Sequence, residues 1–269
     1  MFIRINSFHG TNWFATVFIL IAVCIFGGAS LAKAEVSCGD TITQNTKLGS
    51  DLLDCSGNGI VIGADNITLD CDGHTVSGVG TDGGTIGIVV FGRTGVFVKN
   101  CTVEMFDNGN WLHFGSGNHK LFSNMVRQNG SGINIGDPDN ILFWNILTDN
   151  NATGVLFFDV PGNLPSWNTA DGNSTGFQVS GTRNKLVENT ARGNILTGFA
   201  LVAASENSLI MNKAQENNEG FVLVQNSNDN FLTKNKASGN SVNCINEDTG
   251  TGNIFTKNNF GGTNNCPGP

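Results

Sequence analysis

Residues 176–197 read GFQVSGTRNKLVENTARGNILT, and this stretch is one full period of a repeat that organises the chain. Glycine recurs with a spacing of 22 residues, and two apolar residues follow each glycine at alternating positions. The set comprises Gly132 with Ile133/Ile135, Gly154 with Val155/Phe157, Gly176 with Phe177/Val179, Gly198 with Phe199/Leu201 and Gly220 with Phe221/Leu223. A fixed period of this size indicates a repeat architecture, in which each unit buries its apolar side only by stacking on its neighbours.

The apolar positions alternate with period two over short runs, which predicts strands of about three to five residues and no helix within the repeat. Strands related by one unit then lie parallel, roughly 4.8 Å apart. Each unit also carries asparagines five residues apart, as in Asn184, Asn189 and Asn194. Asparagine suits the bends because it tolerates left-handed backbone geometry, and stacked amides can bond one another along the axis.

This pattern resembles the right-handed parallel β-helix repeat family, with the pectate-lyase-like fold of pectin-degrading enzymes and many periplasmic or surface proteins. Two early strings, GIVIGADNITLDCDGHTVSG at 59–78 and GVFVKNCTVEMF at 95–106, closely resemble the opening of exported β-helix proteins of uncharacterised function. The resemblance implies an all-β, single-stranded right-handed solenoid of about nine coils of roughly 22 residues.

The first 34 residues have the features of a secretory signal peptide. Arg4 gives a positive start, residues 13–26 form an apolar run, and Ala32-Lys33-Ala34 provides a small-x-small cleavage site before Glu35. A retained membrane anchor ranks second because the run is short for a spanning helix. The remaining chain divides into an N-terminal cap (35–58), a parallel β-helix (59–260) and a C-terminal tail (261–269), with no membrane span expected in the mature chain. The expected location is therefore secreted or periplasmic.

Composition narrows the possible partners. Removing Arg4 and Lys33 with the leader leaves 14 − 2 = 12 basic against 22 acidic residues, a net charge of −10. An acidic, exported chain is not expected to bind nucleic acid, whose phosphates attract basic proteins.

Six cysteines remain after the leader, and an even number in an exported chain points to disulfides. Six cysteines allow 15 pairings, and their positions favour Cys38–Cys55, Cys71–Cys101 and Cys244–Cys266 as staples that cap the two ends. No Cys-x-x-Cys pair and no histidine cluster is present, so no metal site is predicted.

Two tryptophans occupy equivalent positions, because Trp144 and Trp167 each precede the middle asparagine of their coils. We expect them outside, one above the other, with Phe143 beside them. Exposed aromatic rings on a β surface are what sugar rings pack against. These three residues are the predicted ligand-binding set. The alternative, that the tryptophans cover a turn or meet a partner chain, stays open.

Three aspartates lie in the bend after the first strand of a coil: Asp137, Asp139 and Asp159. Asp137 and Asp159 are one repeat apart. Two carboxylates so near each other either bind a cation or raise the pKa of one of the two. Arg183 lies in the bend two coils after Asp139. The set resembles the calcium-dependent pectate lyases, which makes these four residues catalytic candidates and calcium the one cofactor to consider. Ordinary turn use of Asp and Pro explains the stretch as well.

Residues 136–139, Gly-Asp-Pro-Asp, also resemble the Asp-Pro-His-Asp motif of mannuronan epimerases. Asp139 replaces the histidine of that motif, and the chain contains no tyrosine to complete such a site. The paired aspartates and Gly-His-Gly of polygalacturonases are missing.

Apolar residues also occupy outward positions of the first strand, which predicts a contact strip for self-association or for docking on a partner. Its members are Leu156, Phe158, Ala200, Val202, Val222 and Val224. In the coil at Gly109 the inward residues are either Leu112 and Phe114 or Trp111 and His113. A slip of one residue exchanges the two faces, so the sequence leaves this open.

The sequence therefore favours an exported β-helix that is not an enzyme and binds polysaccharide or another cell-surface component through its outer face. The alternative is a lyase, epimerase or hydrolase acting on acidic sugars. A third possibility resembles the periplasmic β-helix proteins of the nitrous-oxide reductase system, which serve metalloenzyme maturation. The scarcity of histidine and methionine argues against it.

Overall fold

The computed structural model describes residues 33–246, 250–263 and 265–266. The chain divides into two units, Met1–Ala32 and Lys33–Pro269, and only the second contains described residues. Residues 1–32 of the expected leader and residues 267–269 of the expected tail thus lie outside the described residues. Within the described part of the chain, no helix is long and apolar enough to cross a membrane.

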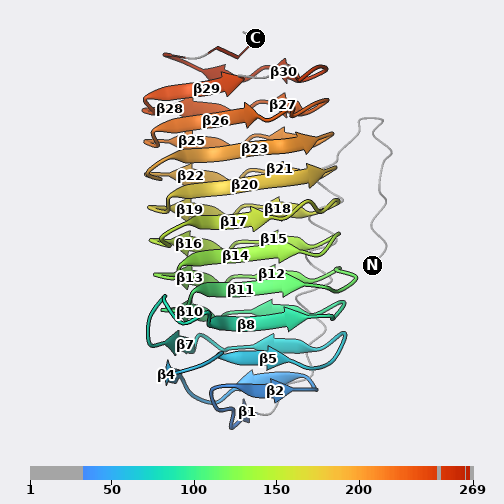
Figure 1. The fold of residues 1–269 in the computed structure, drawn as a ribbon, viewed down its shortest axis with the longest axis vertical. Coiled ribbons are helices and arrows are strands. Elements are labelled where there is room, and N and C mark those ends of the chain that lie inside the picture. The colour runs from blue at the N-terminus through green and yellow to red at the C-terminus, as the bar shows by residue number, and fades with distance from the viewer. Residues whose placement is uncertain (1–32, 247–249, 264, 267–269) are drawn as a thin grey trace, which may run out of the picture. The chain divides into compact units, whose positions relative to one another are not determined.

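The described residues form a solenoid of about nine turns, built from three parallel sheets (Figure 1). The front strands in Figure 1 run from left to right while the chain climbs, so the helix is right-handed. The predicted all-β parallel β-helix is confirmed. From β8 onward, equivalent residues of successive coils are 21, 22 or 23 residues apart, as Asn163 and Asn184, Ile133 and Val155, and Asn140 and Asn163 show. The first coils are less regular, since Ile60 pairs with Ile88 and Thr68 with Phe97. The bends absorb these differences in length.

Each coil contributes one strand to each sheet, in the order B, A, C. Sheet A consists of β1 (Lys33–Ala34), β3 (Thr46–Leu48), β6 (Thr68–Asp70), β9 (Phe97–Lys99), β12 (Lys120–Phe122), β15 (Ile141–Phe143), β18 (Leu164–Ser166), β21 (Lys185–Val187), β24 (Ser208–Ile210), β27 (Phe231–Thr233) and β30 (Ile254–Thr256). Sheet B consists of β2 (Asp40–Ile42), β5 (Ile60–Ile62), β8 (Ile86–Phe91), β11 (Asn108–His113), β14 (Ser131–Gly136), β17 (Thr153–Phe157), β20 (Thr175–Thr182), β23 (Thr197–Ser205), β26 (Glu219–Val224) and β29 (Val242–Asn246). Sheet C consists of β4 (Leu52–Cys55), β7 (Thr75–Gly78), β10 (Thr102–Glu104), β13 (Met125–Arg127), β16 (Ile146–Thr148), β19 (Thr169–Asp171), β22 (Thr190–Arg192), β25 (Lys213–Gln215), β28 (Lys236–Ser238) and β31 (Asn259–Phe260).

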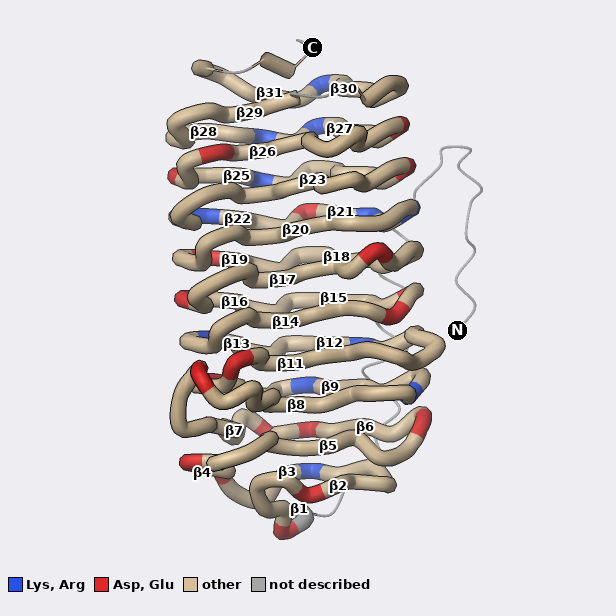
Figure 2. The backbone as a smooth tube through the Cα atoms, in the orientation of Figure 1, with Lys and Arg blue, Asp and Glu red and all other residues tan. Residues whose placement is uncertain are grey.

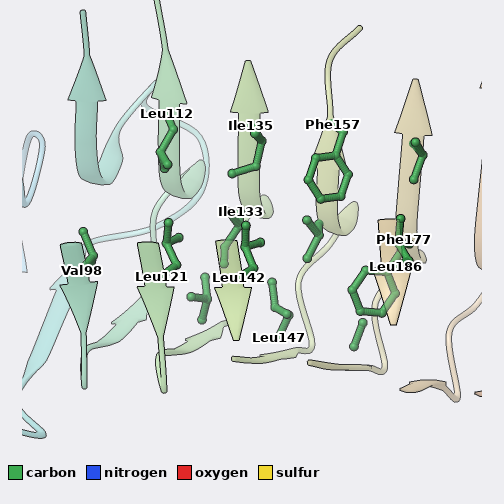
Figure 3. Packing of buried hydrophobic residues seen from close by; sticks show 14 of the residues in the cluster. Val98, Leu112, Leu121, Ile133, Ile135, Leu142, Leu147, Phe157, Phe177 and Leu186 are labelled. Atoms are coloured by element: carbon green, nitrogen blue, oxygen red, sulfur yellow. The ribbon is translucent and has the colours of Figure 1, made fainter. Parts of the chain in front are cut away.

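The interior is a continuous apolar column. Side chains of sheet B such as Leu112, Ile135 and Phe157 point toward Leu121 and Leu142 of sheet A (Figure 3). Higher in the tube the predicted phenylalanine stack is present, with ring centroids 5.0 Å apart for Phe177 and Phe199 and 4.9 Å for Phe199 and Phe221. Such burial is the main favourable term in folding.

The coil at Gly109 resolves differently from both options that the sequence offered. Asn110 and Leu112 are in register with Ile133 and Ile135, so they point inward, whereas Phe114 is 75% exposed. Trp111 pairs with Asn134 on the outer face. An asparagine at an interior apolar position is what hid the register in the sequence.

Asparagine ladders bond the coils along the axis. In each ladder the side-chain oxygen accepts from the backbone N–H and the amide nitrogen of the asparagine one coil before it, as Asn189 does for Asn168, at 3.0 Å each. The Asn189 amide nitrogen in turn donates to the Pro165 carbonyl at 2.9 Å and to Asn212 at 3.0 Å. The ladders start one coil earlier than the regular repeat, with Asn124 and Asn129.

Disulfides staple the first coils and the last described residues. The three bonds are Cys38–Cys55, Cys71–Cys101 and Cys244–Cys266, the pairing that the sequence positions favoured. Lys33 and Ala34, which the sequence assigns to the leader, form β1 and pair with β3.

We predict that Asn189→Ala lowers the free energy of unfolding by about 2–4 kcal/mol. The substitution leaves the Asn168 donors and the Pro165 carbonyl buried without their partner, and each such group costs about 1–3 kcal/mol. Chemical denaturation followed by circular dichroism measures the change. Asn151→Ala, at an exposed asparagine outside the ladders, is the matched control and should change stability by less than about 0.5 kcal/mol. Equal stability of the two variants would contradict the role assigned to the ladder.

Candidate binding surface

An aromatic cluster covers the bend between sheets A and C over three coils. Phe122 and Phe143 end β12 and β15, and Trp144 and Trp167 are the bend residues that follow β15 and β18. Both tryptophans have left-handed backbone geometry, with φ of 55° and 60°. Their N–H groups donate to the Ser166 and Val187 carbonyls of the next coil, at 3.4 and 3.1 Å. These coil-to-coil bonds hold a conformation that otherwise costs about 1–2 kcal/mol in a residue with a Cβ.

The rings of this cluster contact one another rather than forming one flat stack. Trp144 and Trp167 lie edge to face, with centroids 6.5 Å apart and planes at 60°. Phe143 is stacked on Trp167 at 5.9 Å and on Phe122 at 5.8 Å, with planes within 21° and 3°. The tryptophans are therefore vertical neighbours, as expected, but their planes are not parallel.

Exposure differs among the rings. Trp144 is 45% exposed, whereas Phe143 is only 6% exposed. Phe122, Trp144 and Trp167 surround Phe143, with centroids within 5.9 Å of its ring. Phe143 therefore supports the tryptophans, and Trp144 offers the ring surface that a flat apolar ligand can contact.

The row of the tryptophans changes character farther along the solenoid. The equivalent bend positions in later coils are Glu188, Met211, Lys234 and Lys257, all with left-handed φ between 53° and 57°. From β12 onward, the aromatic residues at this bend position are Trp144 and Trp167, and Ser123 occupies the equivalent position after β12. A ligand lying along this row would meet rings first and charged side chains beyond them.

The four catalytic candidates do not share one environment. Asp137 is fully buried, and its Oδ1 accepts from the Gly115 N–H at 2.7 Å. Asp139, Asp159 and Arg183 are exposed bend residues with φ of 57°, 46° and 56°. Because one carboxylate points into the tube and the other points to solvent, the spacing of one repeat between Asp137 and Asp159 does not create a carboxylate pair.

A buried histidine explains why Asp137 points inward. His119 occupies a ladder position, since its N–H donates to Asn140 Oδ1 at 2.8 Å and its Nδ1 accepts from the Val96 N–H at 3.1 Å. The acceptor role of Nδ1 places the proton of a neutral imidazole on Nε2, which lies 3.4 Å from Asp137 Oδ2. Sequence reasoning missed His119. The signal was present, because it stands 21 residues before Asn140 in the ladder.

Potential metal donors are dispersed. The described residues contain no group of three or more His, Cys, Asp or Glu side chains that could hold a metal ion. All six cysteines among the described residues are in disulfides, His74 Nδ1 lies 3.0 Å from Asp51 Oδ1, and His113 Nδ1 lies 3.3 Å from the Gly136 carbonyl. The donor set of the described chain does not fit a copper or calcium centre.

The predicted apolar strip is only partly exposed. Phe158 is 42% exposed, and Leu156, Val202 and Val224 are half-buried. Ala200 and Val222 are only 8% and 7% exposed, because small side chains on a sheet face are covered by their larger neighbours.

We predict that Asp137→Leu lowers the free energy of unfolding by about 1–3 kcal/mol, because the half-buried Gly115 N–H loses its acceptor. Asp137→Asn retains an oxygen for this bond and should lose less than half as much. Thermal unfolding of the two variants measures the difference. A leucine variant as stable as the unsubstituted protein would remove the structural role assigned to Asp137.

Comparisons with known proteins were made on sequence and on structure. The model of one protein family, "Periplasmic copper-binding protein (NosD)", matches residues 30–164 and 139–267. A search of curated protein sequences found no match.

Solved structures with the same fold are distant in sequence. The periplasmic alginate epimerase AlgG has a TM-score of 0.68 at 14% identity, over 86% of this chain and 64% of that one. The Dettilon tailspike protein has a TM-score of 0.59 at 14% identity, over 87% and 60%. DFA-IIIase from Arthrobacter chlorophenolicus A6 without its lid has a TM-score of 0.58 at 14% identity, over 78% and 70%. The chain thus spans less than two thirds of the first two, and the likeness shows the fold.

Proposed function

The chain belongs to the NosD family of periplasmic β-helix proteins, and we propose that it binds polysaccharide through the aromatic cluster of Phe122, Phe143, Trp144 and Trp167. The observation that carries the proposal is the position of Trp144, 45% exposed above a layer of buried and half-buried rings. A pyranose ring has apolar C–H faces that lie flat on an indole, and the surrounding rings keep that indole in place.

The neighbours in fold support this choice of ligand class. AlgG is an alginate epimerase, so a β-helix with this architecture acts on a polysaccharide. The acidic composition of the present chain makes a neutral or weakly charged glycan the better ligand for the aromatic cluster. Farther along the same row, Lys234 and Lys257 provide positive charge for an acidic substituent.

The family description names copper, and copper binding is the alternative that this name raises. The sequence ranked a role in metalloenzyme maturation third, and the family match is an argument in favour of that role. Within the described residues, however, the cysteines are oxidised and the histidines lie apart from one another. Any part in copper handling would therefore run through contact with another protein, rather than through a copper centre in the described solenoid.

We predict that Trp144→Ala weakens glycan binding about tenfold, which corresponds to about 1.4 kcal/mol. A glycan array identifies the ligand, and titration calorimetry with that glycan measures the loss. Phe231→Ala is the matched control, because Phe231 is another partly exposed ring on sheet A four coils away, and it should leave the affinity unchanged.

Two outcomes would contradict the proposal. The first is an array without any bound glycan, accompanied by a loss of thermal stability in Trp144→Ala. That result would show that the tryptophan covers the bend. The second is equal loss of affinity in both variants, which would place the glycan elsewhere on sheet A.

Catalysis on acidic sugars, with or without calcium, remains the second proposal that the sequence raised. We predict no unsaturated oligosaccharide from alginate or polygalacturonate, because Asp137 is buried while Asp139, Asp159 and Arg183 face solvent. Ultraviolet absorbance of the digest measures the unsaturated ends. Unsaturated product that forms in the presence of calcium, and that the Asp159→Ala variant does not form, would show instead that the protein is an enzyme.

A further inference from the structure

The outer face of sheet B is almost free of charge. Within the strands from β5 to β29, the one Asp, Glu, Lys or Arg is Glu219, which begins β26, is half-buried and accepts a hydrogen bond from Thr197. Figure 2 shows β14, β17, β20 and β23 without charged residues, whereas the bends and the other two sheets carry them. Sheet C, for example, presents the ion pairs Arg127–Glu104 and Arg192–Asp171. In a chain with a formal net charge of −8, a sheet face of this length with a single acidic residue is a candidate interface.

The face has a bulky half and a small half. Toward the N-terminal end, Phe91 and Trp111 are in edge contact at 5.5 Å, and Phe114 projects with 75% of its surface exposed. Toward the C-terminal end, the side chains of Ala200 and Val222 project little from the sheet and are only 8% and 7% exposed. β17, with Leu156, lies midway, since two strands separate it from β8 on one side and from β26 on the other.

We propose that this face binds a second copy of the chain, related by a two-fold axis that runs parallel to β17. Rotation about this axis reverses the order of the coils but keeps each residue at the same position along its strand. As a result, β11 lies over β23 and β8 lies over β26 of the second copy. Trp111 then meets Ala200, and Phe91 meets Val224.

The other symmetric arrangement fits poorly. A two-fold axis along the solenoid would place each coil against the same coil of the second copy, with Trp111 against Trp111 and Ala200 against Ala200. The contacts between bulky residues at one end would then keep the two faces apart, and the small residues at the other end would not touch. Shape complementarity therefore selects the axis parallel to β17.

The area is sufficient for a stable dimer. From β5 to β29 there are eight strand spacings, about 38 Å at roughly 4.8 Å each. Strands of five or six residues are about 17 Å wide. The product is about 650 Å² per copy, or about 1,300 Å² in total, which is within the range of stable protein interfaces.

Sedimentation equilibrium of the purified protein tests the proposal. We expect a dimer, and we expect Leu156→Arg to weaken the association at least 100-fold, because the axis brings the two arginines together in an apolar interface. Ile146→Arg is the matched control: Ile146 is an exposed aliphatic residue of β16 in sheet C, and its variant should remain dimeric. Circular dichroism verifies that both variants are folded. A monomer at all concentrations up to about 100 μM, or a Leu156→Arg dimer as tight as the unsubstituted one, overturns the proposal.

A size exchange tests the arrangement within the dimer. Ala200→Trp places a second ring against Trp111 of the other copy and should weaken the dimer, whereas Ala200→Trp combined with Trp111→Ala should restore it. Failure of the double variant to regain affinity would overturn the axis parallel to β17. The aromatic cluster at Trp144 lies on the bend between sheets A and C, so the outcome does not depend on the glycan proposal.

Discussion

The asparagine amide is the group on which this fold depends. A side-chain amide has one oxygen and two N–H donors, and inside an apolar tube each must find a partner. The ladders supply these partners from the coils before and after: the Asn189 oxygen accepts from Asn168, and the Asn189 amide nitrogen donates to Asn212 and to the Pro165 carbonyl. Because the amides repeat at the same bends, every coil turns at the same place.

The outer surface inherits its order from this constraint. Trp144 and Trp167 are neighbours because each precedes a ladder asparagine, Asn145 or Asn168, and those asparagines are bonded to each other. The inward Asp137 has the same origin, since His119 replaces asparagine in the ladder and its ring reaches toward the carboxylate. Rows of side chains far apart in sequence thus become continuous surfaces.

The sequence was sufficient for the fold because a period fixes which residues are vertical neighbours. It placed the phenylalanine stack, the ladders and the three disulfides. It did not give the exposure of single side chains, because exposure depends on the size of the residues around them. Phe143 is covered by three larger or equal rings, and Ala200 is covered because it is short. The coil at Gly109 stayed open because Asn110 is a polar residue at an interior position.

The position of the disulfides determines when the two ends of the solenoid are closed. A parallel solenoid exposes unpaired strand edges at its first and last coils, where further strands could add. Cys38–Cys55 and Cys244–Cys266 close the chain near those two edges, and both require an oxidising compartment to form. Until both bonds have formed, the tube has unlocked ends that can open from either side, and oxidation converts it into a closed one.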